Sequence, residues 1–137
     1  MNMPSTDRAA AHTDDLVELT LPFGHRHAST ARMVAAAVGA DVGFDVDEID
    51  ELRLLVDEAV SVVVDVGGDT DARVSLRFAT GAARAVTVSV AATTGPGLTR
   101  DDIDSLALRI LEAVADEFAV TDGALVITKR RAARDDD

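Results

Sequence analysis

One stretch, FDVDEIDELRLLVDEAVSVVVDVGG at residues 44–68, predicts a long amphipathic helix. Asp45 is a candidate N-cap, and Glu48 follows three residues later in an acidic version of the capping box. Gly67 and Gly68 are expected to end the helix. Between these ends, apolar residues recur at helical spacing: Ile49, Leu52, Val56, Ala59 or Val60, and Val63. The β-branched run at 62–64 is a poor helix former by itself, so tertiary packing must hold it.

Strands are predicted on both sides of this helix. The stretches that alternate apolar and polar residues are LVELTL at 16–21, RVSLRF at 73–78 and AVTVSV at 85–90. A period of two is typical of strands with one buried face. ATGAA at 79–83 supplies a turn, so the last two stretches predict a hairpin. A short strand around FAV at 118–120 leads through the turn signal TDG to a final strand, ALVITKR at 124–130.

Two more helices are expected. HASTARMVAAAVGADVG at 27–43 is rich in alanine, with Ser29 as its candidate N-cap and Gly39 and Gly43 at its exit. After the loop TTGPG, Thr99 is expected to cap another helix, with Asp102 three residues later. The expected buried stripe of that helix is Ile103, Leu106, Ile110 and Val114.

The resulting order, β-α-α-β-β-α-β-β, predicts an α/β two-layer sandwich. Its sheet is expected to be antiparallel, or mixed and mostly antiparallel, with the helices on one face. One domain is expected over residues 15–131. Residues 1–14 are polar and unpatterned and predict a mobile tail, and 132–137 predict a charged, frayed C-terminal tail.

The amino-acid composition limits the kinds of core, binding site and partner that we expect. Aromatic residues make up only 3% of the chain, with no Trp or Tyr, so the core must be aliphatic. There is no cysteine, and His12, His25 and His27 show no ligand spacing, so no metal site is predicted. The net charge of −12 argues against nucleic acid as the main partner and favours a basic protein partner, or simply solubility. No apolar run reaches the ~20 residues that span a bilayer, and no signal peptide is visible, so we expect a cytoplasmic protein.

Three stretches, in their order along the chain, carry a family resemblance: STARMVAAAVGA at 29–40, FDVDEIDELRLLVDEAVS at 44–61 and DGALVITKR at 122–130. They resemble the GHKL (Bergerat) ATPase fold, and within it the small anti-sigma serine kinases RsbW and SpoIIAB, especially the mycobacterial UsfX branch. The resemblance covers about residues 15–131. It implies the GHKL two-layer sandwich, a homodimer, and a site for Mg-ATP.

The nucleotide motifs of that family are degenerate here. In its E-x-x-x-N motif, Glu58 matches the glutamate, whereas the asparagine that holds Mg²⁺ falls on Val62. Valine offers no oxygen to a hard cation. The D-x-G-x-G box, whose aspartate accepts the adenine amino group, is matched by Thr93, Gly95 and Gly97, without the carboxylate.

Two further motifs have also changed. The G-L-G-L motif becomes SLAL at 105–108, where Ser105 and Ala107 replace glycines that allow close approach of phosphate. Only seven residues separate Gly97 from Ser105, so the nucleotide lid of the family is almost absent, and the family's GT becomes Gly123 and Ala124. We therefore expect no bound metal and no ATP unless the degenerate site still binds it, and we interpret Glu58 as vestigial.

The resemblance implies a partner-binding role that does not need catalysis. Anti-sigma factors hold a sigma factor away from RNA polymerase until an anti-anti-sigma factor, a STAS-type antagonist, competes for the same surface. An arginine of the first helix contacts both partners in the family, and the pattern S-x-A-R-x-x-V-A places it at Arg32, with Arg26 as a neighbouring candidate. Two alternatives stay open: a serine/threonine-protein kinase of the RsbW type, and a GHKL-like regulator of another target.

Overall fold

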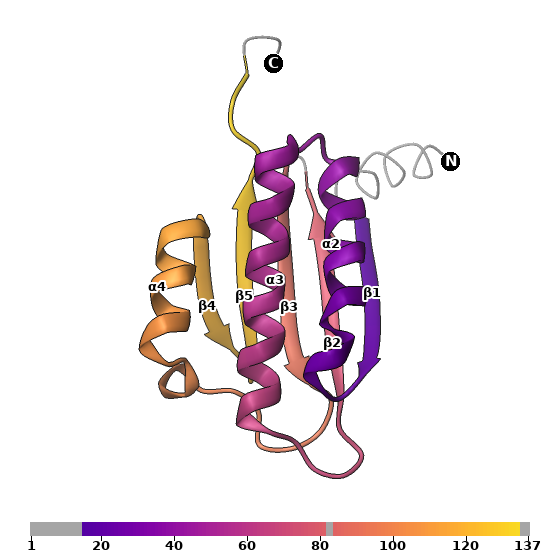
Figure 1. Ribbon diagram of the computed structural model, residues 1–137, viewed down its shortest axis with the longest axis vertical. Coiled ribbons are helices and arrows are strands. Elements are labelled where there is room, and N and C mark those ends of the chain that lie inside the picture. Colours follow the sequence, from indigo (N-terminus) through magenta and orange to yellow (C-terminus); the bar gives the residue numbers. More distant parts are fainter. Residues whose placement is uncertain (1–14, 82–83, 135–137) are drawn as a thin grey trace, which may run out of the picture.

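The computed structural model describes residues 15–81 and 84–134. The predicted tail at 1–14, part of the ATGAA turn and the last three residues lie outside this range. The elements in chain order (Figure 1) are β1 (Asp15–Pro22), a 3₁₀ turn (His25–His27), α2 (Ala28–Asp41), α3 (Val46–Val66), β2 (Arg73–Thr80), β3 (Ala85–Ala92), a 3₁₀ turn (Arg100–Asp102), α4 (Ser105–Val114), β4 (Glu117–Thr121) and β5 (Ala124–Arg130). This order of strands and α-helices confirms the one predicted from the sequence.

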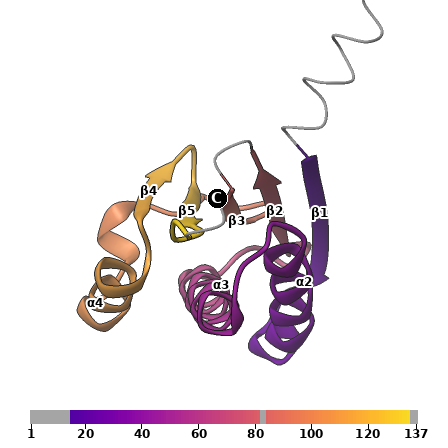
Figure 2. The ribbon, with the colours of Figure 1, turned by 90° about the horizontal axis from the view of Figure 1, so that it is seen from above.

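The five strands form one sheet in the order β1-β2-β3-β5-β4, and each neighbouring pair in it is antiparallel. The alternative of a mixed sheet is therefore wrong for the described strands. Figure 2 shows α2, α3 and α4 on the same side of this sheet. The arrangement is compatible with the expected two-layer α/β sandwich. Within the described residues, no helix is long and apolar enough to cross a membrane.

Helix α3 is the centre of the helical layer, and its local signals are confirmed. The Asp45 carboxylate accepts a hydrogen bond from the Glu48 amide, and the Glu48 carboxylate accepts one from the Asp45 amide, both at 2.8 Å. The helix stops at Gly67, whose φ of +92° favours glycine. Its buried stripe rests on the central strands; the buried apolar residues are Leu52, Leu55, Val56, Ala59, Val60, Val62 and Val63.

The ends of α2 differ from the prediction. Ser29 is exposed within the first turn and caps nothing, because the chain enters α2 directly from the preceding 3₁₀ turn. Gly39 lies inside the helix and is buried. A Cβ there would come within 3.2 Å of the Phe44 ring and 3.3 Å of Ile49, so the glycine allows the helix to approach its neighbours closely. The exit is at Gly43, where φ is +86°.

The third predicted helix is divided in two. The Asp102 carboxylate does accept the Thr99 amide at 2.7 Å, but this pair closes only the 3₁₀ turn. Asp104 is the N-cap of α4 and accepts the Ala107 amide at 2.8 Å. The later start changes which residues are buried: Leu106, expected in the stripe, is 66% exposed, and the buried residues of the helix are Ala107 and Leu111.

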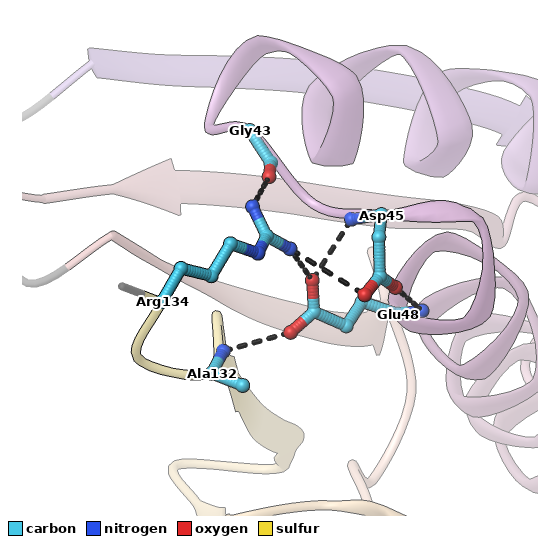
Figure 3. A network of polar contacts seen from close by, with 5 residues as sticks. All are labelled: Gly43, Asp45, Glu48, Ala132 and Arg134. Carbon is cyan, nitrogen blue, oxygen red and sulfur yellow. Dashed lines mark hydrogen bonds and ion pairs between the residues drawn. The ribbon is translucent and has the colours of Figure 1, made fainter. Parts of the chain in front are cut away.

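The end of the described chain returns to the start of α3 (Figure 3). Glu48, a carboxylate only 7% exposed, accepts the Ala132 amide at 2.7 Å and an Arg134 guanidinium N–H at 2.5 Å. Arg134 also donates to the Gly43 carbonyl at 2.6 Å. The expected frayed tail is therefore held in its first residues, because a buried carboxylate needs these donors.

Candidate functional site

Glu58 lies in the middle of α3 and is partly exposed. Its pKa is raised above the ordinary value, first because burial disfavours the charged form. Neighbouring negative charges act in the same direction: those of Asp104, Asp57 and Asp65. Asp57 and Asp65 belong to α3, whereas Asp104 caps α4, so the acidic environment of Glu58 is formed by residues of α3 and of the start of α4.

Val62 follows Glu58 by one turn but belongs to the hydrophobic core. Its side chain is 6% exposed. The motif positions Glu58 and Val62 therefore lie on adjacent turns of α3, but only Glu58 reaches solvent. No group of three or more potential metal-ligating side chains comes together among residues 15–81 and 84–134.

Thr93 extends the pairing of β2 and β3. Its hydroxyl accepts the Arg73 amide at 2.9 Å, and its own amide donates to the Arg73 carbonyl at 2.9 Å. The Thr93 hydroxyl, at the position of the family's adenine-binding aspartate, therefore already accepts a hydrogen bond from the backbone. The next residue, Thr94, donates to Asp69 at 2.6 Å and so ties this loop to the one after α3.

Gly97 and Gly123 bring two loops into backbone contact. A Cβ on Gly97 would lie 3.1 Å from the Gly123 Cα, and the Leu98 amide donates to the Gly123 carbonyl at 3.0 Å. At Gly95 the corresponding distance, to Gly68 Cα, is an ordinary 3.5 Å. Gly97 thus has a packing role that the motif comparison missed, because the two loops are distant in sequence.

Two hollows lie beside these loops: an open one of about 310 Å³, lined by Val66, Gly67, Gly68, Asp69, Gly95 and Pro96, and a much smaller, apolar one. A cavity of about 10 Å³ is lined by Val63, Val66, Gly67, Ala92, Gly97, Leu98 and Gly123. This is room for about one water molecule. At the start of α4, Ser105 is exposed, whereas Ala107 is buried and its amide is already bound by Asp104. A phosphate at this helix terminus would meet a carboxylate that already occupies the N-cap.

Arg32 borders a groove between α2 and α3. The groove has a volume of about 440 Å³ and is lined by Ser29, Arg32, Met33, Ala36 and Arg53. Met33 is 73% exposed. Arg32 donates to the Asp57 carboxylate at 2.6 Å, and their side chains are 36% and 45% exposed. Helix α3 thus provides both Arg53 and the ion-pair partner of Arg32. The sequence comparison did not find these residues, because they face α2 only in the folded chain.

Arg26 is not among the residues that line this groove. It lies on the 3₁₀ turn before α2 and donates to the His27 ring at 3.2 Å. On the same turn, His25 is 3.0 Å from the Asp65 carboxylate near the end of α3. The structure therefore brings Arg32 next to Asp57, but it does not bring Arg26 into the groove.

A hollow of similar size, about 450 Å³, lies elsewhere and contains none of the predicted site residues. It is lined by Asp15, Asp41, Val42, Gly43, Thr80, Gly81, Arg84 and Arg131. Its residues come from four separate parts of the sequence, so no local motif could have indicated it.

Comparison of the chain with models of known protein families finds no match, and comparison with curated proteins finds no related sequence.

Proposed function

We propose that the protein is an anti-sigma-factor-like regulator with a GHKL-like fold, which sequesters a sigma factor without using ATP. An anti-anti-sigma factor of the STAS type would release it by competing for the same surface. The observation that carries this proposal is the position of Arg32 at the border of an exposed groove between α2 and α3. We expect the protein to act in the cytoplasm and, by resemblance to the family, as a homodimer.

The groove has the properties of a protein-binding surface. Arg32 and Arg53 offer planar guanidinium groups that bind carboxylates through paired hydrogen bonds. Met33 adds an exposed, adaptable apolar side chain, a type enriched at interfaces. The overall charge of −12 would in addition attract basic segments of the partner and accelerate encounter at low salt.

Independence from ATP is supported by the altered nucleotide motifs. Val62 is packed in the core and offers no oxygen ligand to Mg²⁺. Asp104 places a carboxylate at the N-cap of α4, where the family binds phosphates, and its charge also acts on Glu58 of α3. The cavity beside Gly97 and Gly123 is far smaller than a nucleotide, and the open hollow of about 310 Å³ beside Gly95 is lined by neither Glu58 nor Val62.

One observation favours the alternative, a serine/threonine-protein kinase. The raised pKa of Glu58 suits a general base, because the protonation equilibrium of such a group lies closer to working pH. Calorimetric titration with Mg-ATP separates the two functions. Micromolar binding supports the kinase, and an absence of heat at millimolar nucleotide supports the ATP-independent regulator.

The proposed function is tested by measuring binding to each purified sigma factor of the source organism. We expect one of them to bind the wild type, and Arg32→Ala to weaken that complex at least about tenfold, because a hydrogen bond between charged groups contributes ~1.5–3 kcal/mol. Arg77→Ala is the matched control, because Arg77 is also exposed and also lies near a carboxylate, at 3.7 Å from Glu18. If no sigma factor binds, or if the two variants behave alike, the proposal is wrong.

A further inference from the structure

The Arg32 guanidinium already holds a carboxylate. Its Nη1 lies 2.6 Å from Asp57 Oδ1, and both side chains remain more than one-third exposed. An ion pair this open to water is weak, because solvent screens the attraction and both side chains lose freedom. Another carboxylate can therefore reach Arg32 from solvent, but it must displace Asp57 to form the same hydrogen bond.

The second arginine of the groove is held in a similar way. Arg53 lies 3.5 Å from Asp50, one turn earlier in α3, and both side chains are exposed. In the described part of the chain, the charged residues that line the groove are Arg32 and Arg53. In a protein with a net charge of −12, the groove is therefore lined by positive side chains, and each of them is paired with a neighbouring aspartate, Asp57 or Asp50.

The form of the groove indicates what it accepts. It runs between two adjacent helices, its lining includes the small side chains of Ser29 and Ala36, and Met33 is exposed beside it. An amphipathic helix fits such a surface by inserting an apolar residue, while acidic residues one turn away reach the arginines. Charge complementarity thus favours an acidic helix over a basic one at this position.

We propose that the α2–α3 groove binds an acidic amphipathic helix of a partner protein, and that Asp57 is an internal competitor whose place on Arg32 the partner's carboxylate takes. This inference rests on the proposed function and adds a means of regulating how tightly the same surface binds its partner. Asp57 lowers the affinity of the groove, because every binding event must break the internal pair. The same competition speeds release, because Asp57 can recapture Arg32 as the partner leaves.

The probe for this competition is a synthetic 14-residue helical peptide with glutamates flanking leucines, added to the full-length protein. We expect Asp57→Asn to bind the peptide about twofold to fivefold more tightly than the wild type, which is the range that breaking an exposed ion pair allows. Asp65→Asn is the matched control: it removes the same charge from the same helix, but Asp65 pairs with His25. That variant should bind like the wild type.

A double variant assigns the effect to Arg32. In an Arg32→Ala background, Asp57→Asn should no longer change peptide affinity, since there is no guanidinium to release. Equal or weaker binding by Asp57→Asn, or no peptide binding to any variant, would overturn the inference. These results are independent of the sigma-factor titration: peptide binding with the expected pattern, but without a sigma-factor complex, would reject the proposed function and leave the groove chemistry intact.

Discussion

Val62→Asn introduces, at a side chain that is 6% exposed, the residue type that holds Mg²⁺ in the family that the sequence resembles. Losing the buried valine costs roughly 1.5–3 kcal/mol. Burying an amide without partners adds about 1–3 kcal/mol. We therefore expect the variant to lose about 3–5 kcal/mol of unfolding free energy. For a domain of this size, that loss corresponds to a fall in Tm of roughly 10–20 °C.

The assay is urea unfolding of the wild type, Val62→Asn and Val64→Asn, combined with calorimetric titration of each protein with Mg-ATP. Val64 is the matched control, because the same substitution two positions away falls on a half-buried residue. We expect the control to lose clearly less stability and none of the three proteins to bind Mg-ATP. If Val62→Asn were as stable as the wild type and bound Mg-ATP, the side chain would face an open nucleotide site, and the argument from its burial would be wrong.

Three further outcomes follow from the structure. Gly97→Ala should destabilise the protein by about 1–3 kcal/mol in urea unfolding, because its Cβ would meet Gly123 at 3.1 Å with φ at +81°. Gly95→Ala carries the same kind of backbone strain, with φ at +102°, but its nearest contact is at 3.5 Å, so it should cost less; equal losses would contradict the close contact of the two loops. Glu48→Ala should lose about 1–3 kcal/mol, since it removes both the capping box and the acceptor for the C-terminal segment, and an unchanged unfolding midpoint would show that these bonds contribute nothing. Glu58→Gln should be more stable than the wild type at pH 7. Because the pKa of Glu58 is raised in the folded state, the wild-type protein loses stability as the pH rises from about 4.5 through that folded-state pKa. The advantage of the variant should therefore disappear below pH 4.5, and a difference in stability that does not change with pH would contradict this origin.

Local signals made most of the fold predictable. The capping box of α3 and the alternation in the β2–β3 hairpin each depend on residues close in sequence, and both are confirmed. The wrong predictions concern helix starts, where an adjoining turn or another residue took the place of the expected N-cap. The 3₁₀ turn before α2 made a cap at Ser29 unnecessary, and Asp104 capped α4 in place of Thr99.

The contacts of the candidate site depend on the tertiary fold. Arg32 was indicated by a family pattern, but its partner Asp57 lies 25 residues away and on another helix. Glu48 was predicted as a capping residue, whereas its bond to Ala132 spans 84 residues. The periodicity of apolar residues cannot reveal such pairs. It indicates which face of a helix or strand is buried, but not which other element that face contacts.

The most direct test of the proposed function is calorimetric binding of the cognate sigma factor to the wild type and to Arg32→Ala, each with and without Mg-ATP. We predict a dissociation constant for the wild type that Mg-ATP leaves unchanged, and a complex at least about tenfold weaker for Arg32→Ala. Binding that requires Mg-ATP, or that is indifferent to the loss of Arg32, would contradict an ATP-independent regulator that acts through the α2–α3 groove.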